Sequence, residues 1–296
     1  MATSVEHLSR PVRRRRVDQT VPLELPHSRQ RSPIRRATIA VHAAACLLLV
    51  IPRNWPLSLG LVAANHLLLT ALGLWPRSTL LGPNHTRLSA SATSARQVAI
   101  TIDDGPDPEV TPLVLDLLDR HAGKATFFCV GRRVAEHAAL AREIVSRGHQ
   151  IENHTQRHLH SFSLLGPKGM AREIAQAQET ITAVTGVRPR YFRAPAGLRN
   201  PFLDFILVKQ HLQLVSWTRR GFDTVQTDAA AILARLTRGL GGGDILLLHD
   251  GHTARAADGT PLILKVLPHL LAAIADARLS TVTLDTGLDA REELLA

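Results

Sequence analysis

The stretch that decides the fold runs Ile100-Thr101-Ile102-Asp103-Asp104-Gly105-Pro106-Asp107-Pro108. It continues an apolar run that begins at Val98 and is typical of a short buried strand. The strand ends on two adjacent carboxylates and is then broken by Gly-Pro. Successive side chains of a strand point to opposite sides, so the two Asp residues are suited to different tasks, one to metal binding and one to proton transfer. An Asp-rich turn explains the stretch alone equally well, because Asp, Gly and Pro all favour turns.

The composition allows one folded domain and an appendage. Of the 296 residues, 45% are hydrophobic, which is enough for a core of about 200 residues plus a further segment. The formal net charge of +10 is unevenly spread. Residues 1–36 hold nine Arg against Glu6, Asp18 and Glu24, a net of +6, which leaves +4 for the other 260 residues. The part beyond residue 36 is therefore expected to have no nucleic-acid partner, and no obligate protein partner is indicated.

The chain has two cysteines, Cys46 in an apolar run and Cys129 in a predicted strand. Their number and spacing indicate neither a disulfide framework nor a zinc-binding pair. Both are expected to act as small apolar side chains.

Two uncharged apolar runs follow a basic N-terminal tail. Residues 1–36 lack apolar periodicity and are expected to be disordered. The run 56–75 has 20 residues and is long enough to cross a bilayer, whereas the run 37–51, with 15, is marginal. Trp55 and Trp75 bracket the longer run as interface anchors would. One or two transmembrane helices are expected here. A helical pair packed on the folded domain is the alternative, and the long charged tail and the second apolar run argue against a cleaved signal peptide.

The number of spans decides on which side of the membrane the rest of the chain lies. The nine Arg before residue 37 are expected to keep the N-terminus in the cytoplasm. If residues 37–75 form a hairpin of two spans, the remainder is cytoplasmic. With a single span and an interfacial partner helix, the remainder is periplasmic or external. Arg77 and Arg87, which follow the second run, favour the hairpin.

Beyond residue 96 the chain alternates strands and helices. Residues 76–96 are rich in polar residues, Pro, Gly and Ser and are expected to form a linker before a domain at 97–290. The predicted strands are 97–103, 124–130, 149–153, 190–193, 212–217, 244–249 and 280–284. The predicted helices are 109–122, 132–147, 167–186, 201–210, 227–240 and 261–277. Such alternation predicts an α/β fold with a parallel sheet, and a barrel fits better than an open sheet. No GxGxxG or P-loop follows a strand, so nucleotide binding is unsupported.

Polar side chains recur where the predicted strands end. In a parallel α/β barrel these ends share one face, on which active sites form. The segment His154-Thr155-Gln156-Arg157-His158 places two histidines at i and i+4, on one face if the segment is helical. Two His and one carboxylate leave open positions on a metal, as a hydrolytic site requires. His85 and His160 have no comparable partners and are expected at the surface. The polar residues at strand ends are Asp103, Asp104, His154, His158, Arg193, Asp223 and His249.

Five motifs carry a family resemblance. They are TIDDGPDP (101–108), HTQRH (154–158), RAPAG (193–197), WTRRGFD (217–223) and LLLHD (246–250). Their combination and order resemble the NodB-type polysaccharide deacetylases, carbohydrate esterase family 4, across roughly residues 95–285. The resemblance implies a distorted (β/α) barrel that removes N- or O-acyl groups from sugars with a divalent metal.

The resemblance also implies roles for individual residues. Asp104, His154 and His158 correspond to the metal ligands. Asp103 corresponds to the general base that deprotonates water, and His249 to the general acid that protonates the leaving amine. A His₂Asp set suits Zn²⁺, although Co²⁺, Ni²⁺ or Mn²⁺ could occupy it.

Further positions correspond to supporting residues. Arg193 would hold the charge of Asp103, and Asp223 would pair with His249 and keep it protonated. The backbone N–H of Ala196 would stabilise the oxyanion, and Leu247 would line the pocket for the acyl methyl. The expected substrate-contacting set is Ala196, Pro195, Leu247, Trp217 and Arg220.

Several positions depart from the family pattern. Ile102 and Ala196 replace aromatic residues, Arg220 stands where Asp is usual, and Thr224 stands where Trp is usual, while Asp223 is kept. We therefore expect the chemistry to be retained and the substrate to differ. The missing aromatics weaken the case for a long polysaccharide groove.

Three arginines and one loop are open to interpretation. Arg199, Arg219 and Arg220 are candidates for contacting a phosphate, and solvated surface arginines are the alternative. The loop 250–259 follows His249 and is either a lid or a plain surface loop.

The leading hypothesis is a metal-dependent hydrolase in the inner (cytoplasmic) membrane of a bacterium. It would remove an acetyl or other acyl group from an N-acetylated amino sugar, on a polysaccharide or a lipid-linked glycan. An O-acyl esterase or a deformylase would use the same machinery. A non-catalytic membrane-bound carbohydrate-binding protein is the alternative of another class, and the retained ligands, base and acid argue against it.

Overall fold

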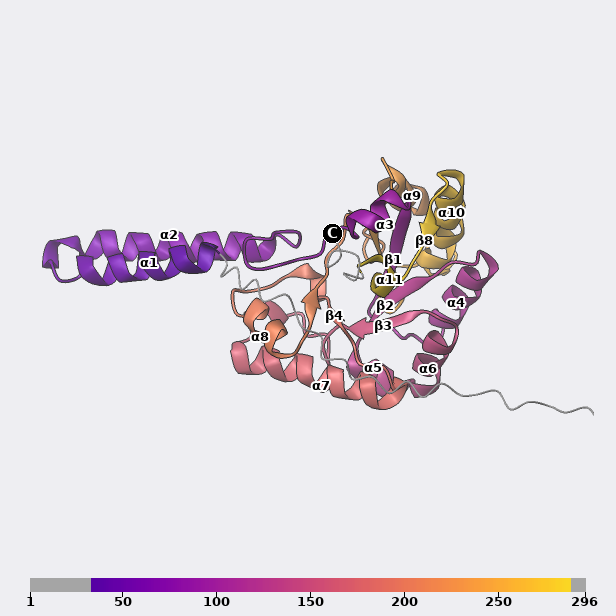
Figure 1. The fold of residues 1–296 in the computed structure, drawn as a ribbon, viewed down its shortest axis with the longest axis horizontal. Coiled ribbons are helices and arrows are strands. Elements are labelled where there is room, and N and C mark those ends of the chain that lie inside the picture. The colour runs from indigo at the N-terminus through magenta and orange to yellow at the C-terminus, as the bar shows by residue number, and fades with distance from the viewer. Residues whose placement is uncertain (1–32, 289–296) are drawn as a thin grey trace, which may run out of the picture. The chain divides into compact units, whose positions relative to one another are not determined.

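A parallel sheet organises residues 97–281 in the computed structural model, which describes residues 33–288 of the chain (Figure 1). Within this range the strand order is β5-β4-β3-β2-β1-β7-β6, all ladders are parallel, and β8 pairs with the start of β1. The predicted α/β barrel-type fold is confirmed. The strands are β1 (Gln97–Asp103), β2 (Ala125–Cys129), β3 (Gln150–Asn153), β4 (Tyr191–Phe192), β5 (Gln213–Leu214), β6 (Arg219–Arg220), β7 (Ile245–His249) and β8 (Ser280–Thr281).

Strand β1 lies at the centre of the sheet and sends its side chains alternately outward and inward. Val98, Ile100 and Ile102 belong to the apolar core beneath the helices, and all three are fully buried. Thr101 and Asp103 point the other way, as the period of two requires. In register, Asp103 lies opposite His249 of β7. The central pairing therefore brings a carboxylate and an imidazole to the same edge of the sheet.

The helices between the strands cover the outer face of the sheet (Figure 1). In α4 the buried residues Val114, Leu115 and Leu118 recur at helical spacing and pack into the same core as β1. The helices of this domain are α3 (Ala90–Ser94), α4 (Thr111–Arg120), α5 (Gly131–Glu136), α6 (Ala138–Ser146), α7 (Pro167–Thr185), α8 (Leu203–Lys209), α9 (Ala229–Thr237), α10 (Leu262–Asp276) and α11 (Leu284–Gly287).

Two predicted elements differ in the structure, one by a break and one by its length. The helix predicted at 132–147 is broken at His137, where the backbone leaves the helical region (φ −122, ψ 49). The break lets α5 pack against α7 and α6 against both α7 and β3. The strand predicted at 212–217 is limited to the two residues of β5, and the equally short β6 was not predicted.

The segment 76–96, predicted as a linker, is instead part of the domain. His85 forms a bridge with Val215 beside β5, and its neighbour Arg87 forms a bridge with Asp244 just before β7. The Leu88 amide also donates to the Gly243 carbonyl at 2.9 Å. The polar backbone of this stretch is thus satisfied by strand edges rather than by solvent. The linker prediction is wrong because a polar composition cannot distinguish a solvated linker from a segment that pairs with strand edges.

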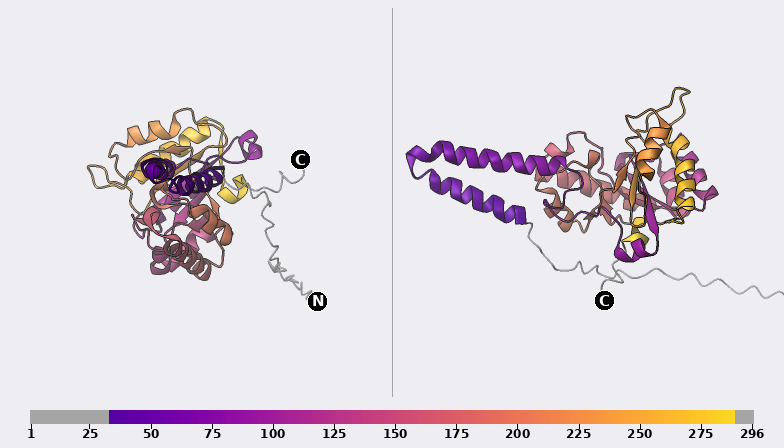
Figure 2. Two further views of the ribbon diagram at one scale, coloured as in Figure 1. Left: turned by 90° about the vertical axis from the view of Figure 1, so that its left-hand side faces the viewer. Right: turned by 90° about the horizontal axis from the view of Figure 1, so that it is seen from above.

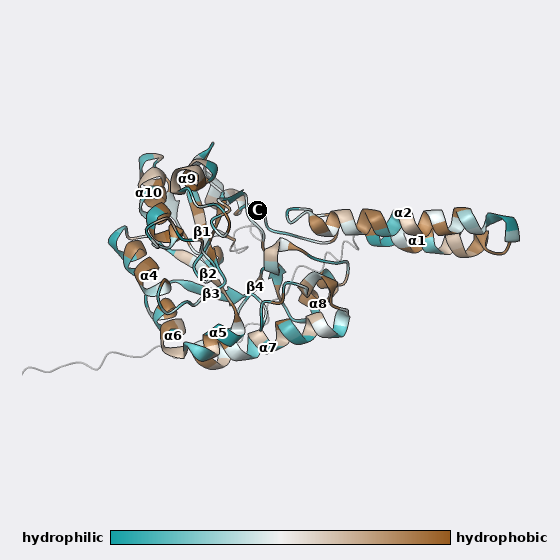
Figure 3. Cartoon of the chain, turned by 180° about the vertical axis from the view of Figure 1, so that it is seen from behind, coloured by the Kyte–Doolittle hydropathy of each residue, from teal (hydrophilic) through white to brown (hydrophobic). Residues whose placement is uncertain are grey.

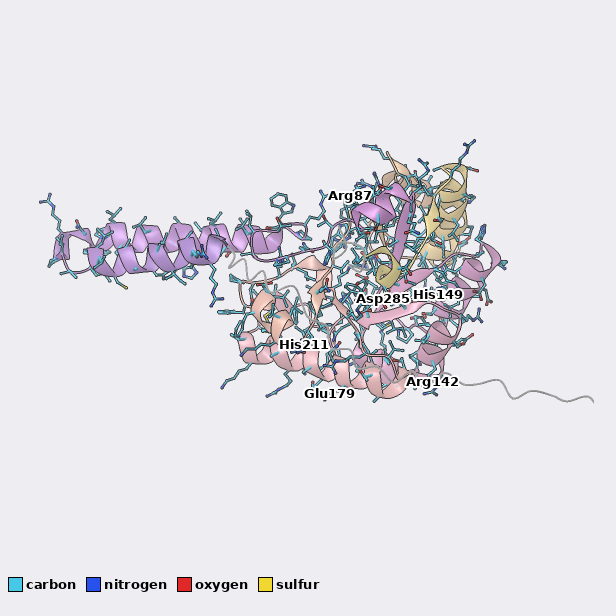
Figure 4. All side chains as sticks on the ribbon, viewed as in Figure 1. Arg87, Arg142, His149, Glu179, His211 and Asp285 are labelled. Carbon is cyan, nitrogen blue, oxygen red and sulfur yellow. The ribbon has the colours of Figure 1, made fainter. Side chains whose placement is uncertain are left out.

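Asp244 fastens this segment to the sheet. Its carboxylate is 1% exposed and accepts from Arg87 at 2.9 Å and from Arg219 at 2.6 Å. Arg87, labelled in Figure 4, lies near α3 and the start of β1. The Arg87 side chain is 50% exposed and that of Arg219 is 18% exposed, so the carboxylate is the buried member of both ion pairs.

Residues 33–74 form a helical hairpin of α1 (Pro33–Leu48), the short η1 (Pro52–Asn54) and α2 (Trp55–Leu74). Figures 1 and 2 show α1 and α2 side by side. The basic tail predicted at 1–36 lies outside the described residues except for 33–36, which begin α1 rather than being disordered. Within the described range one helix, Pro52–Leu74, is long and apolar enough to cross a membrane.

The hairpin places polar groups inside and large apolar groups outside. Between the helices, Thr38 donates to the Asn65 side chain at 3.2 Å, and Ser58 donates to the Ala45 carbonyl at 2.8 Å. In Figure 3, much of α2 is brown, the hydrophobic end of the scale. This pattern suits an apolar surrounding better than water. The exposed large apolar side chains here are Ile39, Leu47, Leu49, Val50, Ile51, Trp55, Leu57, Leu59, Leu67, Leu68, Leu74 and Trp75.

Candidate metal centre and active site

A pocket of about 350 Å³ opens where the central strands end. It collects residues from the ends of β1, β6 and β7 and from the loops after β3 and β4. Most of the predicted site residues lie around it. The lining residues are Asp103, Asp104, His154, His158, His160, Ala196, Gly197, Trp217, Arg220, Thr224, Leu247, His249 and His252.

The two adjacent carboxylates face the same pocket. Asp103 is the last residue of β1, and Asp104 follows it in a left-handed backbone conformation (φ 78). Strand alternation alone would have sent them to opposite faces. That expectation is wrong, because the left-handed residue turns the chain and redirects the second side chain inward.

Asp104, His154 and His158 bring three donor atoms together. The Oδ1 atom of Asp104 lies 3.2 Å from His154 Nε2 and 3.0 Å from His158 Nε2. All three donor atoms are within 4.8 Å of one another. Oδ1 is buried and has no hydrogen-bond partner within residues 33–288. A buried oxygen without a hydrogen bond, faced by two imidazole nitrogens, is what a divalent cation between them would satisfy, so the residues fit a metal ion.

The two histidines converge through a loop rather than a helix. Thr155 and His158 both have left-handed backbone conformations, with φ of 68 and 52. The Asn153 side chain accepts from the Thr155 amide at 2.9 Å, and the Thr155 hydroxyl accepts from the His158 amide at 3.0 Å. The i, i+4 helical interpretation is therefore wrong. Side-chain hydrogen bonds to the backbone shape this loop instead.

A carbonyl orients the first of these imidazoles. His154 Nδ1 lies 2.8 Å from the Arg193 carbonyl, which can only accept, so Nδ1 carries the proton. In the neutral ring the Nε2 atom then keeps its lone pair and faces Asp104. Outer partners of this kind fix the tautomer of metal-binding histidines.

Two further histidines approach the donor set. His252 Nδ1 lies 3.0 Å from Asp104 Oδ2, the oxygen that faces away from His154 and His158. His160, predicted at the surface, lines the pocket with its ring 5.9 Å from that of His158. Neither was predicted as a site residue. The only signal for His252 was its place in the loop just after the strand that ends at His249.

The imidazoles decide the charge of Asp104. Burial alone would raise the pKa of this carboxyl, but His154, His158 and His252 outweigh it and bring the pKa well below its usual range. Burial is the main cause that lowers the pKa of His158. An ionised carboxylate and a neutral imidazole are the forms in which these groups bind metals.

Arg193 holds Asp103 from the interior of the domain. Its guanidinium is 1% exposed and donates to Asp103 Oδ1 at 2.6 Å and to the Thr101 hydroxyl at 2.8 Å. It also donates to the Ser216 carbonyl at 2.8 Å and lies 4.1 Å from the centre of the Phe128 ring. Burial lowers the pKa of Arg193, and the Asp103 charge opposes that shift. Asp103 Oδ2 is left on the side of the donor set, 3.9 Å from His154 Nε2.

His249 and Asp223 form a second buried pair. His249 Nδ1 lies 2.9 Å from Asp223 Oδ1, and the His249 amide donates to the other carboxylate oxygen at 2.8 Å. Burial lowers the pKa of His249, but the charges of Asp223, Asp103 and Asp104 more than compensate and raise it to about 9. The imidazolium is therefore the form present at neutral pH, and its Nε2 remains available.

The predicted substrate-contacting residues divide into two groups. Ala196, Trp217, Arg220 and Leu247 line the pocket. Pro195 is buried and is not among the lining residues. Ala196 has a left-handed backbone (φ 55) within the short η3 (Pro195–Gly197).

The three candidate phosphate-binding arginines have different surroundings. Arg199 is 5% exposed and donates to the Ser78 carbonyl. Arg219 is held by Asp244. Both side chains are held within the domain, so neither is a solvated surface arginine and neither is free to bind a substrate. Of the three arginines, Arg220 alone lines the pocket.

The loop 250–259 is tied to the domain at several points. Asp250 is 1% exposed and accepts from the Thr111 hydroxyl at 2.5 Å. The Ala254 amide donates to the Asp223 carbonyl at 2.7 Å. The loop is therefore anchored beside both the donor set and the His249–Asp223 pair.

Comparison with known proteins agrees with this geometry. Residues 90–215 match the polysaccharide deacetylase family, a range that includes Asp103, Asp104, His154, His158 and Arg193 and ends before Asp223 and His249. The chain is 34% identical over 175 residues to a peptidoglycan-N-acetylglucosamine deacetylase of Bacillus cereus, covering 58% of this chain and 81% of the relative. It is 35% identical over 161 residues to a chitooligosaccharide deacetylase of Bradyrhizobium sp., covering 54% and 73%. A family 4 carbohydrate esterase from Streptomyces lividans, solved with acetate, superimposes with a TM-score of 0.58 at 30% identity over 65% of this chain and 95% of that chain.

The contact of His252 with Asp104 yields a prediction about metal binding. We expect His252→Ala to weaken the affinity for Zn²⁺ about 10- to 100-fold, as loss of an outer partner does, because Asp104 Oδ2 loses the group that orients it. Competition with a Zn²⁺ chelator measures this affinity without turnover. His211→Ala, which removes an exposed imidazole after α8 (Figure 4), should leave the affinity unchanged. Equal affinities for His252→Ala and the unaltered protein would show that His252 does not orient the carboxylate.

Proposed function

The chain belongs to the polysaccharide deacetylase family and is a carbohydrate deacetylase, and we propose that it hydrolyses the N-acetyl group of an amino sugar with a divalent metal ion. One observation carries this proposal. The Asp104-His154-His158 donor set shares one pocket with Asp103 and His249, which are register partners on neighbouring strands. A metal site flanked by a carboxylate and an imidazolium has the parts that amide hydrolysis requires.

Asp104, His154 and His158 would hold the ion, and Zn²⁺ suits this set best. When bound there, such an ion supplies Lewis acidity, which favours deprotonation of water and polarises a carbonyl group. Three protein ligands leave coordination positions open, as distinct from a closed structural site.

Asp103 is placed to act as the general base. Arg193 donates to its Oδ1 at 2.6 Å, and this hydrogen bond fixes the orientation of the carboxylate. Its Oδ2 lies on the side of the donor set and is the atom that would take the proton from the attacking water.

His249 is placed to act as the general acid. Its Nδ1 faces Asp223, so the proton on Nε2 is the one that can be donated to the leaving amine. An amine is a poor leaving group unless it is protonated. The carboxylate of Asp223 keeps the imidazole protonated until that step.

Ala196 and Leu247 would complete the site. The Ala196 backbone N–H would donate to the oxygen that gains negative charge, and removal of one such donor typically costs about 10²–10³ in rate. Leu247, 1% exposed at the pocket wall, would contact the acyl methyl group.

The relatives favour N-acetylglucosamine units as the substrate. They are described as peptidoglycan-N-acetylglucosamine and chitooligosaccharide deacetylases, which share that sugar. The same residues would also serve an O-acyl esterase or a deformylase acting on a lipid-linked sugar. A non-catalytic binding protein is less well supported, because the donor set, the carboxylate and the imidazolium are all present.

The hairpin of α1 and α2 is proposed to be embedded in the inner membrane of a bacterium. Its outward apolar surface and its inward hydrogen bonds support this assignment. Because both helices pair along their length, both ends of the hairpin would lie on one side of the membrane. The nine Arg of residues 1–36 would then place the catalytic domain in the cytoplasm.

Replacing Asp103 tests the catalytic assignment. We expect Asp103→Asn to lower kcat for acetate release from tetra-N-acetylchitotetraose by about 10²–10⁴ and to retain one Zn²⁺ per chain. Asp116→Asn, which alters an exposed carboxylate of α4, is the control and should keep full activity. An Asp103→Asn protein that remains active would contradict the assignment. Wild-type protein that binds Zn²⁺ and the sugar but releases no acetate would favour the non-catalytic alternative.

The pH profile tests the role of His249. The acid is active when protonated, so kcat/KM should be constant at neutral pH and fall as the pH rises through about 9. Asp223→Asn removes a charge that raises this pKa, so the alkaline limb should move to lower pH by about one unit or more. Profiles of the two proteins with the same metal content measure the shift. If the alkaline limb of Asp223→Asn lies at the same pH as that of wild type, a group other than His249 causes the limb.

Reporter fusions test the membrane topology. A green fluorescent protein fused after the last residue of the full chain should fluoresce, because a hairpin returns the chain to the cytoplasm. Alkaline phosphatase fused at the same position should be inactive. The opposite pair of results would show a single span and a catalytic domain outside the cytoplasm.

A further inference from the structure

Arg220 is a cation at the pocket with no acidic partner among residues 33–288. It belongs to β6, lies opposite Leu247 of β7 in register, and lines the same pocket as the donor set. Its Nε atom is buried and has no hydrogen-bond partner in residues 33–288. No carboxylate within this range lies within ion-pair distance of its guanidinium.

The other charges of the pocket are already compensated. Arg193 pairs with Asp103, and His249 pairs with Asp223. Asp104 faces imidazoles, and a divalent cation there would add positive charge. The Arg220 charge is also felt inside the domain, where it contributes to lowering the pKa of Arg193. With a divalent cation held by Asp104, the three carboxylates Asp103, Asp104 and Asp223 would face more positive charge than they carry, and a neutral sugar would not offset the excess.

Aromatic rings hold the guanidinium in place. The Arg220 Cζ atom lies 5.4 Å from the centre of the Trp217 ring and 4.9 Å from that of Phe222. Stacking of this kind uses the faces of the guanidinium and leaves its N–H edges free for an anion. Trp217 is 7% exposed and belongs to the core, so it is a rigid support.

The cationic surface continues beyond Phe222. The Arg235 Cζ atom lies 5.6 Å from the centre of the same Phe222 ring. Phe222, Val225, Gln226 and Arg235 line a second hollow of about 330 Å³. Phe222 itself is 42% exposed and has a left-handed backbone (φ 63). An aromatic ring near two guanidinium groups, those of Arg220 and Arg235, thus borders the pocket where hydrolysis is proposed.

We infer that the substrate is an N-acylated amino sugar that carries an anionic substituent, phosphate or carboxylate, and that Arg220 binds this group. The inference rests on the proposed function and names its substrate class. A guanidinium binds both kinds of oxyanion through two parallel hydrogen bonds. Phe222 and Arg235 extend the recognition surface toward the part of the substrate beyond the anion. Unmodified chitin-type oligomers carry no group for Arg220.

Matched substrates test this inference on the full chain in detergent with Zn²⁺. N-acetylglucosamine is the neutral reference, N-acetylglucosamine 1-phosphate adds a phosphate, and N-acetylmuramic acid adds a carboxylate. We expect kcat/KM for at least one anionic sugar to exceed that of the neutral sugar about tenfold or more, the usual effect of a charge-assisted hydrogen bond. The sugar whose kcat/KM is higher shows whether Arg220 recognises a phosphate or a carboxylate.

Variants of Arg220 separate recognition from catalysis. In Arg220→Gln the preference ratio should fall towards one, mainly through a higher KM for the anionic sugar, and Arg220→Lys should restore part of it. Arg142→Gln removes an exposed arginine of α6 (Figure 4) and should leave the ratio unchanged. Calorimetric titration of the metal-free proteins with the anionic sugar should show weaker binding for Arg220→Gln than for wild type.

The outcomes distinguish this inference from the function on which it rests. Equal turnover of neutral and anionic sugars, or an Arg220→Gln protein that keeps the preference, overturns the anionic substrate and leaves the deacetylase proposal standing. Acetate release from none of these sugars, nor from tetra-N-acetylchitotetraose, overturns the proposed function itself.

Discussion

The buried ion pair between Arg193 and Asp103 is the interaction on which the rest of the site depends. A guanidinium that is 1% exposed is costly unless all its donors are used, and here they reach β1 and the chain after β5. The backbone carbonyl of the same arginine accepts from His154. One residue therefore fixes the carboxylate proposed as base and the ring proposed as metal ligand. The distance between the Asp103 carboxylate and the His154 ring is therefore set by a buried residue rather than by flexible surface groups.

Left-handed backbone gives the site its shape. Asp104, Thr155, His158, Ala196 and Phe222 all have positive φ without being glycine, and all lie at the pocket or in its loops. Each such residue costs of order 1–3 kcal/mol and persists only where its surroundings enforce it. Side-chain hydrogen bonds supply that enforcement around Thr155. The local rules for strands and helices fail at these residues because tertiary contacts determine their conformation.

The difference between local rules and tertiary contacts also explains which elements could be predicted from the sequence. Strands β1, β2 and β7 follow from long apolar runs that are buried on both faces. Strands β4, β5, β6 and β8 have two residues each, and only their neighbours define them. The motifs gave Asp103, Asp104, His154, His158, Arg193, Asp223 and His249 as a group, and the structure gathers them. His252 and His160 were missed because a single histidine in a polar loop has no local signal.

Arg220, which departs from the family pattern, lies in a different part of the sheet from Asp103 and His249, which follow it. Asp103 and His249 end strands that are paired on both sides, so a change there disturbs two ladders and the buried Arg193. Arg220 lies on β6, which ends the sheet and pairs only with β7 among the described strands. A two-residue edge strand can accept a different side chain with little effect on the core, because one flank is unconstrained. The replacement of an expected Asp by Arg reverses the charge at this edge of the pocket and leaves the donor set intact. The groups proposed for hydrolysis thus lie at the centre of the sheet, and the residue proposed to select the sugar lies at its edge.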